Sequence, residues 1–480
     1  MRRGGAGLGT GLSASVLVLA LLGCGQQYRP VVSAINPVGP AAQPTKYAVA
    51  VSNPGTSSAG LLTMVDFSGD SILATPQILP DPNWLAIFSS GGEAAIINPQ
   101  NSLSTVPLSA PSTLITSEVV QTALPTNPPA NAPTLSAFTF GGQTRILIPE
   151  AGRSSVAILS SASPALQQEI ALPATPIYVV GVDTTARAYA ISNSGPSSQG
   201  VVSAIEGSSL STSATIPVGV NPVYGVETAT TASTGPARAF ILNKGSGTVS
   251  VINVINNALD ANSNLGPNST IAVGQNPVWA DLIAATNELV VLNQGDGVHP
   301  GSLSIISIPL CNTAAQPTNP ACDASNPVDA AGFGAVIATV PVGVNPVEVA
   351  ALADGSQAYV INDGNPGAGV LPSVSAVNLA SATVTATIPA VPICPANPSS
   401  SPGCSQTAPA VAANCPDGTT LTCVYGTPNT LAVTNSTPTG KVYVTSGDSN
   451  YMTVIETVTD TVDTHINLQG LGVQVRVTAP

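Results

Sequence analysis

The sequence predicts an all-β fold built from repeated four-stranded units, and three observations support this prediction. Valine, isoleucine, leucine and threonine dominate the patterned stretches, and branched side chains pack well on a pleated sheet. Glycine and proline, with 44 residues each, supply frequent turns between short strands. One pattern also recurs along most of the chain, at intervals of roughly 50 residues.

Each repeat joins a proline-rich linker to two apolar strands. The clearest linkers are Ile216-Pro-Val-Gly-Val-Asn-Pro-Val-Tyr224, Ile271-Ala-Val-Gly-Gln-Asn-Pro-Val-Trp279 and Val340-Pro-Val-Gly-Val-Asn-Pro-Val-Glu348. Each linker leads into a first strand, a polar turn and an apolar second strand, and third and fourth strands follow in several units. Glycine and asparagine after the second strand are expected to take the positive φ angles of a tight hairpin.

Second strands of this kind begin near residues 46, 93, 144, 186, 237, 287, 356 and 440, which gives eight units. Four short antiparallel strands per unit at this period are typical of propeller blades. We therefore predict a single β-propeller of seven or eight four-stranded blades. The C-terminal strand, about Val473 to Thr478, is expected to close the ring as the innermost strand of the first blade.

The motifs Ala358-Tyr-Val-Ile-Asn362 and Lys441-Val-Tyr-Val-Thr445, with the linker, resemble the YVTN repeat of bacterial β-propellers. The resemblance covers residues 46–480. It is weak in the second and third units, where the linker is reduced to Ala132-Pro133 and Thr175-Pro176. Seven blades is the common number in that family. If only seven blades form here, the weakly patterned second unit is the one expected not to be a blade.

The first 24 residues have the features of a bacterial lipoprotein signal peptide. Arg2 and Arg3 precede a short apolar run that ends in Leu21-Leu22-Gly23-Cys24. This ending resembles the lipobox, which implies cleavage before Cys24 and attachment of lipid to its thiol. An ordinary signal peptide in which Cys24 is incidental is the alternative. Residues 25–45 hold several Pro, Gly and Gln and are expected to form a tether.

The expected location is therefore extracytoplasmic, with the membrane as a partner through the lipid on Cys24. The outer membrane or the periplasmic face is favoured, because Gly25 stands where many lipoproteins of the inner membrane carry aspartate.

Six further cysteines lie in two insertions, at 311–334 and 391–426. An even number in an exported chain predicts disulfides, and proximity in sequence favours the first two as a pair with the other four pairing among themselves. Metal binding is the alternative, but no CxxC pair occurs, so we predict no metal. The candidate disulfide cysteines are Cys311, Cys322, Cys394, Cys404, Cys415 and Cys423.

Charge and motifs argue against several function classes. The formal net charge of −13 provides no basic surface for nucleic acid. The chain contains no GxSxG, HExxH or Walker motif, and its two histidines, His299 and His465, are expected in solvated turns. We therefore predict no cofactor and no catalytic residues.

One register of the repeat carries aromatic residues. First strands line the channel of a propeller, and both tryptophans of the chain stand two residues after the opening of a first strand. An aromatic rim there would stack on a flat or glycan-like ligand, or anchor a protein partner. The alternative is that these side chains wedge between blades as core. The register holds Trp84, Leu135, Tyr178, Tyr224, Trp279, Glu348, Thr430 and Gln474, of which Trp84, Tyr178, Tyr224, Trp279 and Glu348 form the candidate ligand rim.

The sequence thus favours a non-catalytic binding or scaffolding propeller at the cell envelope, with the oligomeric state left open. A lactonase-like hydrolase is one alternative, since some bacterial propellers of similar sequence are of that type. Its charged groups would be Glu348, Asp281 and Arg476. A purely structural envelope protein is the other alternative.

Overall fold

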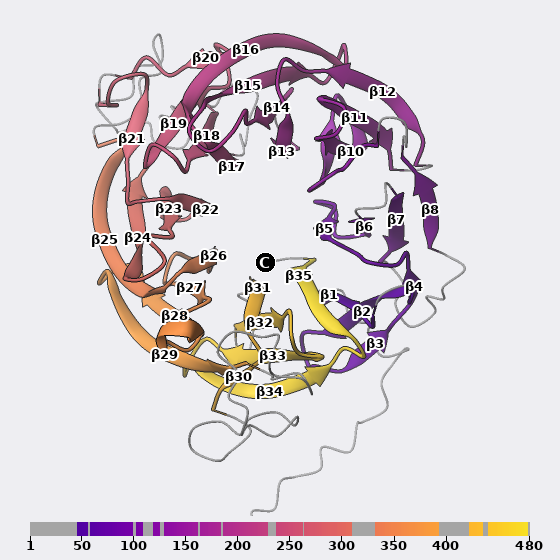
Figure 1. Cartoon of the computed structure of the whole chain (residues 1–480), viewed down its shortest axis with the longest axis vertical. Coiled ribbons are helices and arrows are strands. Elements are labelled where there is room, and N and C mark those ends of the chain that lie inside the picture. The colour runs from indigo at the N-terminus through magenta and orange to yellow at the C-terminus, as the bar shows by residue number, and fades with distance from the viewer. Residues whose placement is uncertain are drawn as a thin grey trace, which may run out of the picture. The chain divides into compact units, whose positions relative to one another are not determined.

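Eight sheets, antiparallel except for the pair of β29 (Thr383–Val391) and β30 (Val424–Tyr425), stand around a central channel in the unit from Pro44 to Pro480 (Figure 1). The computed structural model describes residues 46–55, 58–98, 102–108, 119–124, 129–161, 164–183, 186–228, 237–262, 264–309, 332–392, 422–434 and 440–478. The predicted all-β propeller is confirmed with eight blades, and the second unit is a blade like the others. No helix among these residues is long and apolar enough to cross a membrane.

The strands of each blade run from the channel outward. The first strands are β35 (Leu471–Val477), β5 (Trp84–Ile87), β9 (Ser136–Phe140), β13 (Pro176–Val180), β17 (Pro222–Glu227), β22 (Pro277–Ile283), β26 (Pro346–Ala351) and β31 (Pro428–Thr434). The second strands are β1 (Tyr47–Asn53), β6 (Glu93–Asn98), β10 (Gln143–Glu150), β14 (Arg187–Ser192), β18 (Arg238–Asn243), β23 (Glu288–Asn293), β27 (Gln357–Asn362) and β32 (Lys441–Ser446).

The two outer positions of each blade complete the sheets. The third strands are β2 (Gly60–Asp66), β7 (Ser102–Pro107), β11 (Ser155–Ser160), β15 (Gln199–Glu206), β19 (Thr248–Asn253), β24 (Pro300–Ser307), β28 (Ser373–Asn378) and β33 (Tyr451–Glu456). The fourth are β3 (Ile72–Ala74) with β4 (Gln77–Ile78), β8 (Val120–Ala123), β12 (Leu166–Ala171), β16 (Ser211–Val220), β20 (Ala258–Leu259) with β21 (Thr270–Ala272), β25 (Ala335–Val344), β29 (Thr383–Val391) and β34 (Thr461–Asn467). The short β30 (Val424–Tyr425) adds to β29, and the 3-10 turn η3 (Pro366–Ala368) lies between β27 and β28.

The C-terminal strand closes the ring, as predicted. Strand β35 pairs antiparallel with β1, with Val475 opposite Ala50. The side chains of Lys441 and Tyr443 in the last blade both bond to Asp70 in the first blade. Closure removes the two edges that an open ring of sheets would leave unpaired.

The core consists of apolar layers between neighbouring blades. Each of the eight large apolar clusters draws on two adjacent blades, including the last and the first. Second strands are therefore covered on both faces, and their residues read as continuous apolar runs rather than alternating ones. Ile96 and Ile97 of β6, for example, point to opposite faces and are both buried.

The spacing that recurs in the linkers reflects a contact between the linker glycine and the next second strand. A Cβ on Gly274 would lie 2.7 Å from Cγ of Asn293, at the end of β23. The amide of Asn293 in turn donates to the hydroxyl of Ser304 on the third strand, at 2.9 Å. Glycine is required because only the absence of a side chain leaves room for this amide. Equivalent contacts join Gly219 to Asn243 and Gly343 to Asn362.

The predicted backbone role of asparagine is wrong in one respect. Asn293 lies within β23, and the positive φ belongs instead to the linker asparagine Asn276, at 54°. Asparagine tolerates the left-handed region because its short polar side chain hydrogen-bonds locally, and the following proline opens the first strand. Gly295, after the second strand, does take a positive φ of 74°.

The structure also bears on the predictions for His465 and for the disulfide cysteines. His465 lies in β34 rather than in a solvated turn; its ring packs 4.2 Å from that of Tyr425 and its Nδ1 lies 3.0 Å from the hydroxyl of Thr453. Cys423 is buried and takes part in a disulfide. Cys24 and the other five cysteines lie outside the described residues, so the pairing and the lipid site remain predictions.

Candidate functional site

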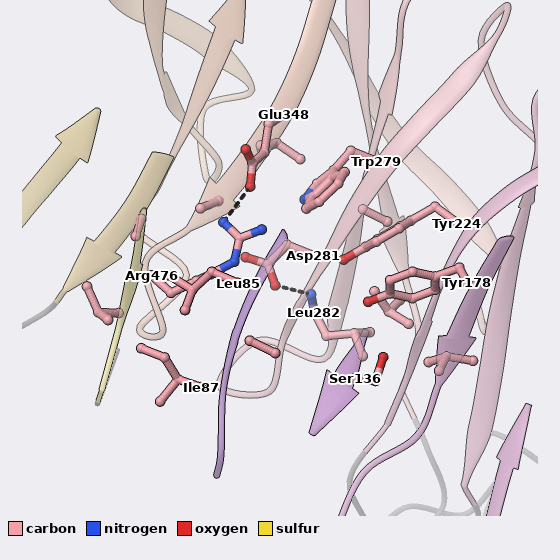
Figure 2. Close-up of a pocket in the computed structure, with 18 of the residues that line it drawn as sticks. Leu85, Ile87, Ser136, Tyr178, Tyr224, Trp279, Asp281, Leu282, Glu348 and Arg476 are labelled. Carbon is pink, nitrogen blue, oxygen red and sulfur yellow. Dashed lines mark hydrogen bonds and ion pairs between the residues drawn. The ribbon is translucent and has the colours of Figure 1, made fainter. Parts of the chain in front are cut away.

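A cavity of about 490 Å³ occupies the channel, and all eight first strands contribute to its wall (Figure 2). Its lining starts at the register of Trp84 and Trp279 and continues toward the carboxyl ends of the first strands, as far as Ile87 and Leu282. The cavity therefore lies on one side of that register.

Four aromatic rings form the floor of the cavity. Trp84 comes from the second blade, and Tyr178, Tyr224 and Trp279 come from the fourth, fifth and sixth. Their centroids make a closed circuit: Trp84–Tyr178 6.3 Å, Tyr178–Tyr224 4.8 Å, Tyr224–Trp279 4.2 Å and Trp279–Trp84 6.2 Å. The second and sixth blades face each other in a ring of eight, so the contact between the two tryptophans spans the channel. We call these four residues the aromatic floor.

Space above the floor comes from small side chains at the next inward-facing position. Alternate residues of a strand point to the same side, so the position two residues after the floor register also faces the channel. It carries alanine or valine in six blades, and charged residues, Asp281 and Arg476, in the other two. The small residues are Ala86, Ala137, Val180, Val226, Ala350 and Ala432.

Arg476 crosses from the closing strand to the floor. Its guanidinium carbon lies 5.9 Å from the ring centroids of both Trp84 and Trp279, within the range of a cation–π contact. Its Nη1 donates to Oε1 of Glu348 at 3.0 Å (Figure 2). The ion pair joins the first blade to the seventh.

Asp281 faces the same space, but backbone groups bond to its carboxylate. Oδ1 accepts the N–H of Leu282 at 2.8 Å, and Oδ2 accepts the N–H of Ala351 at 2.9 Å. Burial raises the pKa of Asp281 to about 6, against the lowering effect of these bonds and of Arg476. Burial also raises the pKa of Glu348 to about 7, although Arg476 opposes this shift. Both carboxyls thus change charge near neutral pH.

The structure brings all five residues of the candidate ligand rim into one cavity, but leaves the ligand role of the rim a prediction. Of the other members of the register, Leu135 also lines the cavity but is buried in the core between blades, while Thr430 and Gln474 bond to neighbouring blades. The sequence contained a signal for the two charged residues beside the rim, because Asp281 and Arg476 each follow a member of the register by two positions.

Among solved structures, the chain is similar to apo AztD from Citrobacter koseri, with 10% identity and a TM-score of 0.50 over 90% of this chain and 97% of that one. A second AztD structure from Citrobacter koseri gives 9% and 0.49 over the same shares. A functionally unknown protein from Desulfotomaculum acetoxidans DSM 771 gives 13% and 0.45, over 90% and 99%. At such identities the likeness shows the β-propeller fold alone. No protein-family model and no curated protein matches the chain, so membership of the YVTN family stays a prediction.

Proposed function

We propose that this chain is a non-catalytic binding propeller, anchored to the bacterial cell envelope by lipid on Cys24, that takes a small ligand into its channel cavity. The observation that carries the proposal is the cavity itself. A concave site that combines apolar surface with a few convergent polar groups is typical of ligand binding. Here the aromatic floor supplies the apolar surface, and Asp281, Glu348 and Arg476 supply the polar groups.

The tryptophans give a direct test of binding. Both tryptophans of the chain lie in the floor, so we expect a ligand that enters the cavity to change their fluorescence emission. The mature protein would be purified from envelopes of its source, and bound small molecules identified by native mass spectrometry. We expect a molecule that shifts the emission when returned to the stripped protein.

Matched variants locate that molecule. Trp279→Phe is expected to weaken its binding, whereas Tyr451→Phe, in the third strand of the eighth blade, is expected to leave binding unchanged. Equal binding by both variants, or binding without any change in tryptophan emission, would contradict a channel site.

The proposed anchor has its own experiment. The full chain and its Cys24→Ser variant would be expressed in a bacterial host and the membranes separated by centrifugation. We expect the parent in the membrane pellet and the variant released from it, because removal of the thiol removes the site of lipid attachment. Ser33→Ala, nearby in the sequence, serves as the control. Retention of Cys24→Ser in the pellet would contradict anchoring at this residue.

One observation favours the hydrolase alternative: a carboxyl with a pKa of about 7, as at Glu348, suits general acid–base catalysis. The same carboxyl is bound to Arg476, which orients it within the wall. Assays on simple lactones with the parent and Glu348→Gln separate the two functions. Turnover that disappears in the variant would establish the hydrolase in place of the binding protein.

A further inference from the structure

We propose that the ligand of the channel cavity carries an organic cation, an amine, guanidinium or quaternary ammonium group, held on the aromatic floor beside Asp281. This inference rests on the proposed function, because it specifies the chemistry of the same cavity. It draws on the ring geometry, on the charges in the wall and on the position of Arg476.

Arg476 shows that the floor accepts a cation. Its guanidinium carbon is equidistant, at 5.9 Å, from the centroids of Trp84 and Trp279. Aromatic faces attract cations electrostatically, and tryptophan does so most strongly. The floor also contains Tyr178 and Tyr224, whose rings continue the same circuit away from Arg476. The chain's own cation therefore covers only the tryptophan part of the floor.

The charges in the wall favour a second cation over an anion. The cavity is lined by two carboxyls, Asp281 and Glu348, and by one guanidinium, Arg476. Arg476 pairs with Glu348, while Asp281 bonds to backbone N–H groups instead. One carboxylate therefore remains for an incoming cation. An anion would have to compete with Glu348 for Arg476 and would also face Asp281.

Three probes of nearly identical shape separate charge from shape. Choline, 3,3-dimethylbutan-1-ol and 3,3-dimethylbutanoate each end in a compact group of three methyls, and they are cationic, neutral and anionic respectively. The cavity of about 490 Å³ has room for each of them. We expect choline to shift the tryptophan emission and to bind about tenfold more tightly than the alcohol. The anion is expected to bind most weakly.

A variant tests the role of Asp281. Asp281→Asn keeps the size of the side chain and removes its charge, so choline affinity is expected to fall about tenfold while that of the alcohol stays the same. Asp463→Asn, at an exposed position of β34, is the matched control and should change neither. A melting temperature recorded for each variant verifies that the fold is retained.

The pH dependence gives a second readout with a definite sign. Glu348, Arg476, Tyr178 and Tyr224 surround Asp281 in the cavity. A bound cation favours the ionised carboxylates, so binding releases protons, and choline affinity should rise as pH increases through about 6 and about 7, the pKa values of Asp281 and Glu348. An anion would show the opposite trend.

Two results would overturn the cation proposal. If the alcohol or the anion binds as tightly as choline, the cavity remains a binding site but its ligand is not a cation. If none of the three probes shifts the tryptophan emission, the cavity has no cation-binding site. The proposal that the cavity binds a small ligand is then decided by the molecule that co-purifies with the protein.

Discussion

The channel wall has two halves that use the same register of the repeat in different ways. In blades two to six this register carries Trp84, Leu135, Tyr178, Tyr224 and Trp279, whereas in blades seven, eight and one it carries Glu348, Thr430 and Gln474. In both halves the first strand is the innermost strand of its blade. The difference therefore lies in what the side chain contacts.

Polar residues of the first strands join neighbouring blades. Thr430 accepts the backbone N–H of Val475 at 2.9 Å, and Gln474 accepts that of Leu85. Glu348 likewise accepts the N–H of Leu431. A first strand is the inner edge of its sheet, so some of its N–H groups have no strand partner and need another acceptor. In the polar half of the wall, formed by blades seven, eight and one, a side chain of the preceding blade is that acceptor.

The aromatic half does not provide such acceptors at this register; its rings contact one another across the channel. Asp281, two residues after Trp279, continues the polar pattern by accepting the N–H of Ala351 in the next blade. The comparison teaches that the repeat determines where a side chain stands. The residue type then decides whether it stabilises the ring or forms the cavity.

The largest expected effect is on binding through the aromatic half. The double variant Tyr178→Ala/Tyr224→Ala removes the two floor rings that Arg476 does not cover, which should weaken choline binding about 100-fold, or about 3 kcal/mol. The emission of Trp84 and Trp279, which both remain, measures the binding. Because both rings are half-buried, the protein should remain folded. A collapse of thermal stability with unchanged binding would instead identify the rings as core.

Gln474→Leu is expected to have the converse effect in the polar half. It leaves the buried N–H of Leu85 without its acceptor, which costs about 2 kcal/mol of unfolding free energy. Denaturant titration measures this change, and choline affinity should stay close to that of the parent. An unchanged unfolding midpoint would show that the bond between the first and second blades contributes nothing.

Thr430→Val should show a smaller loss of the same kind, about 1 kcal/mol. The variant keeps the shape but removes the hydroxyl that accepts the N–H of Val475 and lies 2.9 Å from the hydroxyl of Thr445. The effect is smaller because Thr430 is half-buried and water can replace part of the bond. A loss equal to that of Gln474→Leu would remove burial as the explanation for the ranking.

Much of the fold could be predicted because it depends on local pattern. The recurring second strands predicted seven or eight blades, of which the structure has eight. The strand after Gly472 was expected to complete the first blade, which the pairing of β35 with β1 confirms. The contact of Gly274 with Asn293 could not be predicted, since neighbouring units must first pack before the missing side chain acquires a purpose. The location of His465 was missed because the strand around it is polar on one face.

The sequence by itself determined which residues share a register, and it placed both tryptophans there, because alternation along a strand is a local property. Only the tertiary structure decided that rings from opposite blades meet and that Arg476 of the last strand reaches Glu348. Those contacts depend on how the closed ring brings eight separate strands to one axis. No spacing within the chain encodes the distance between side chains that meet across a channel.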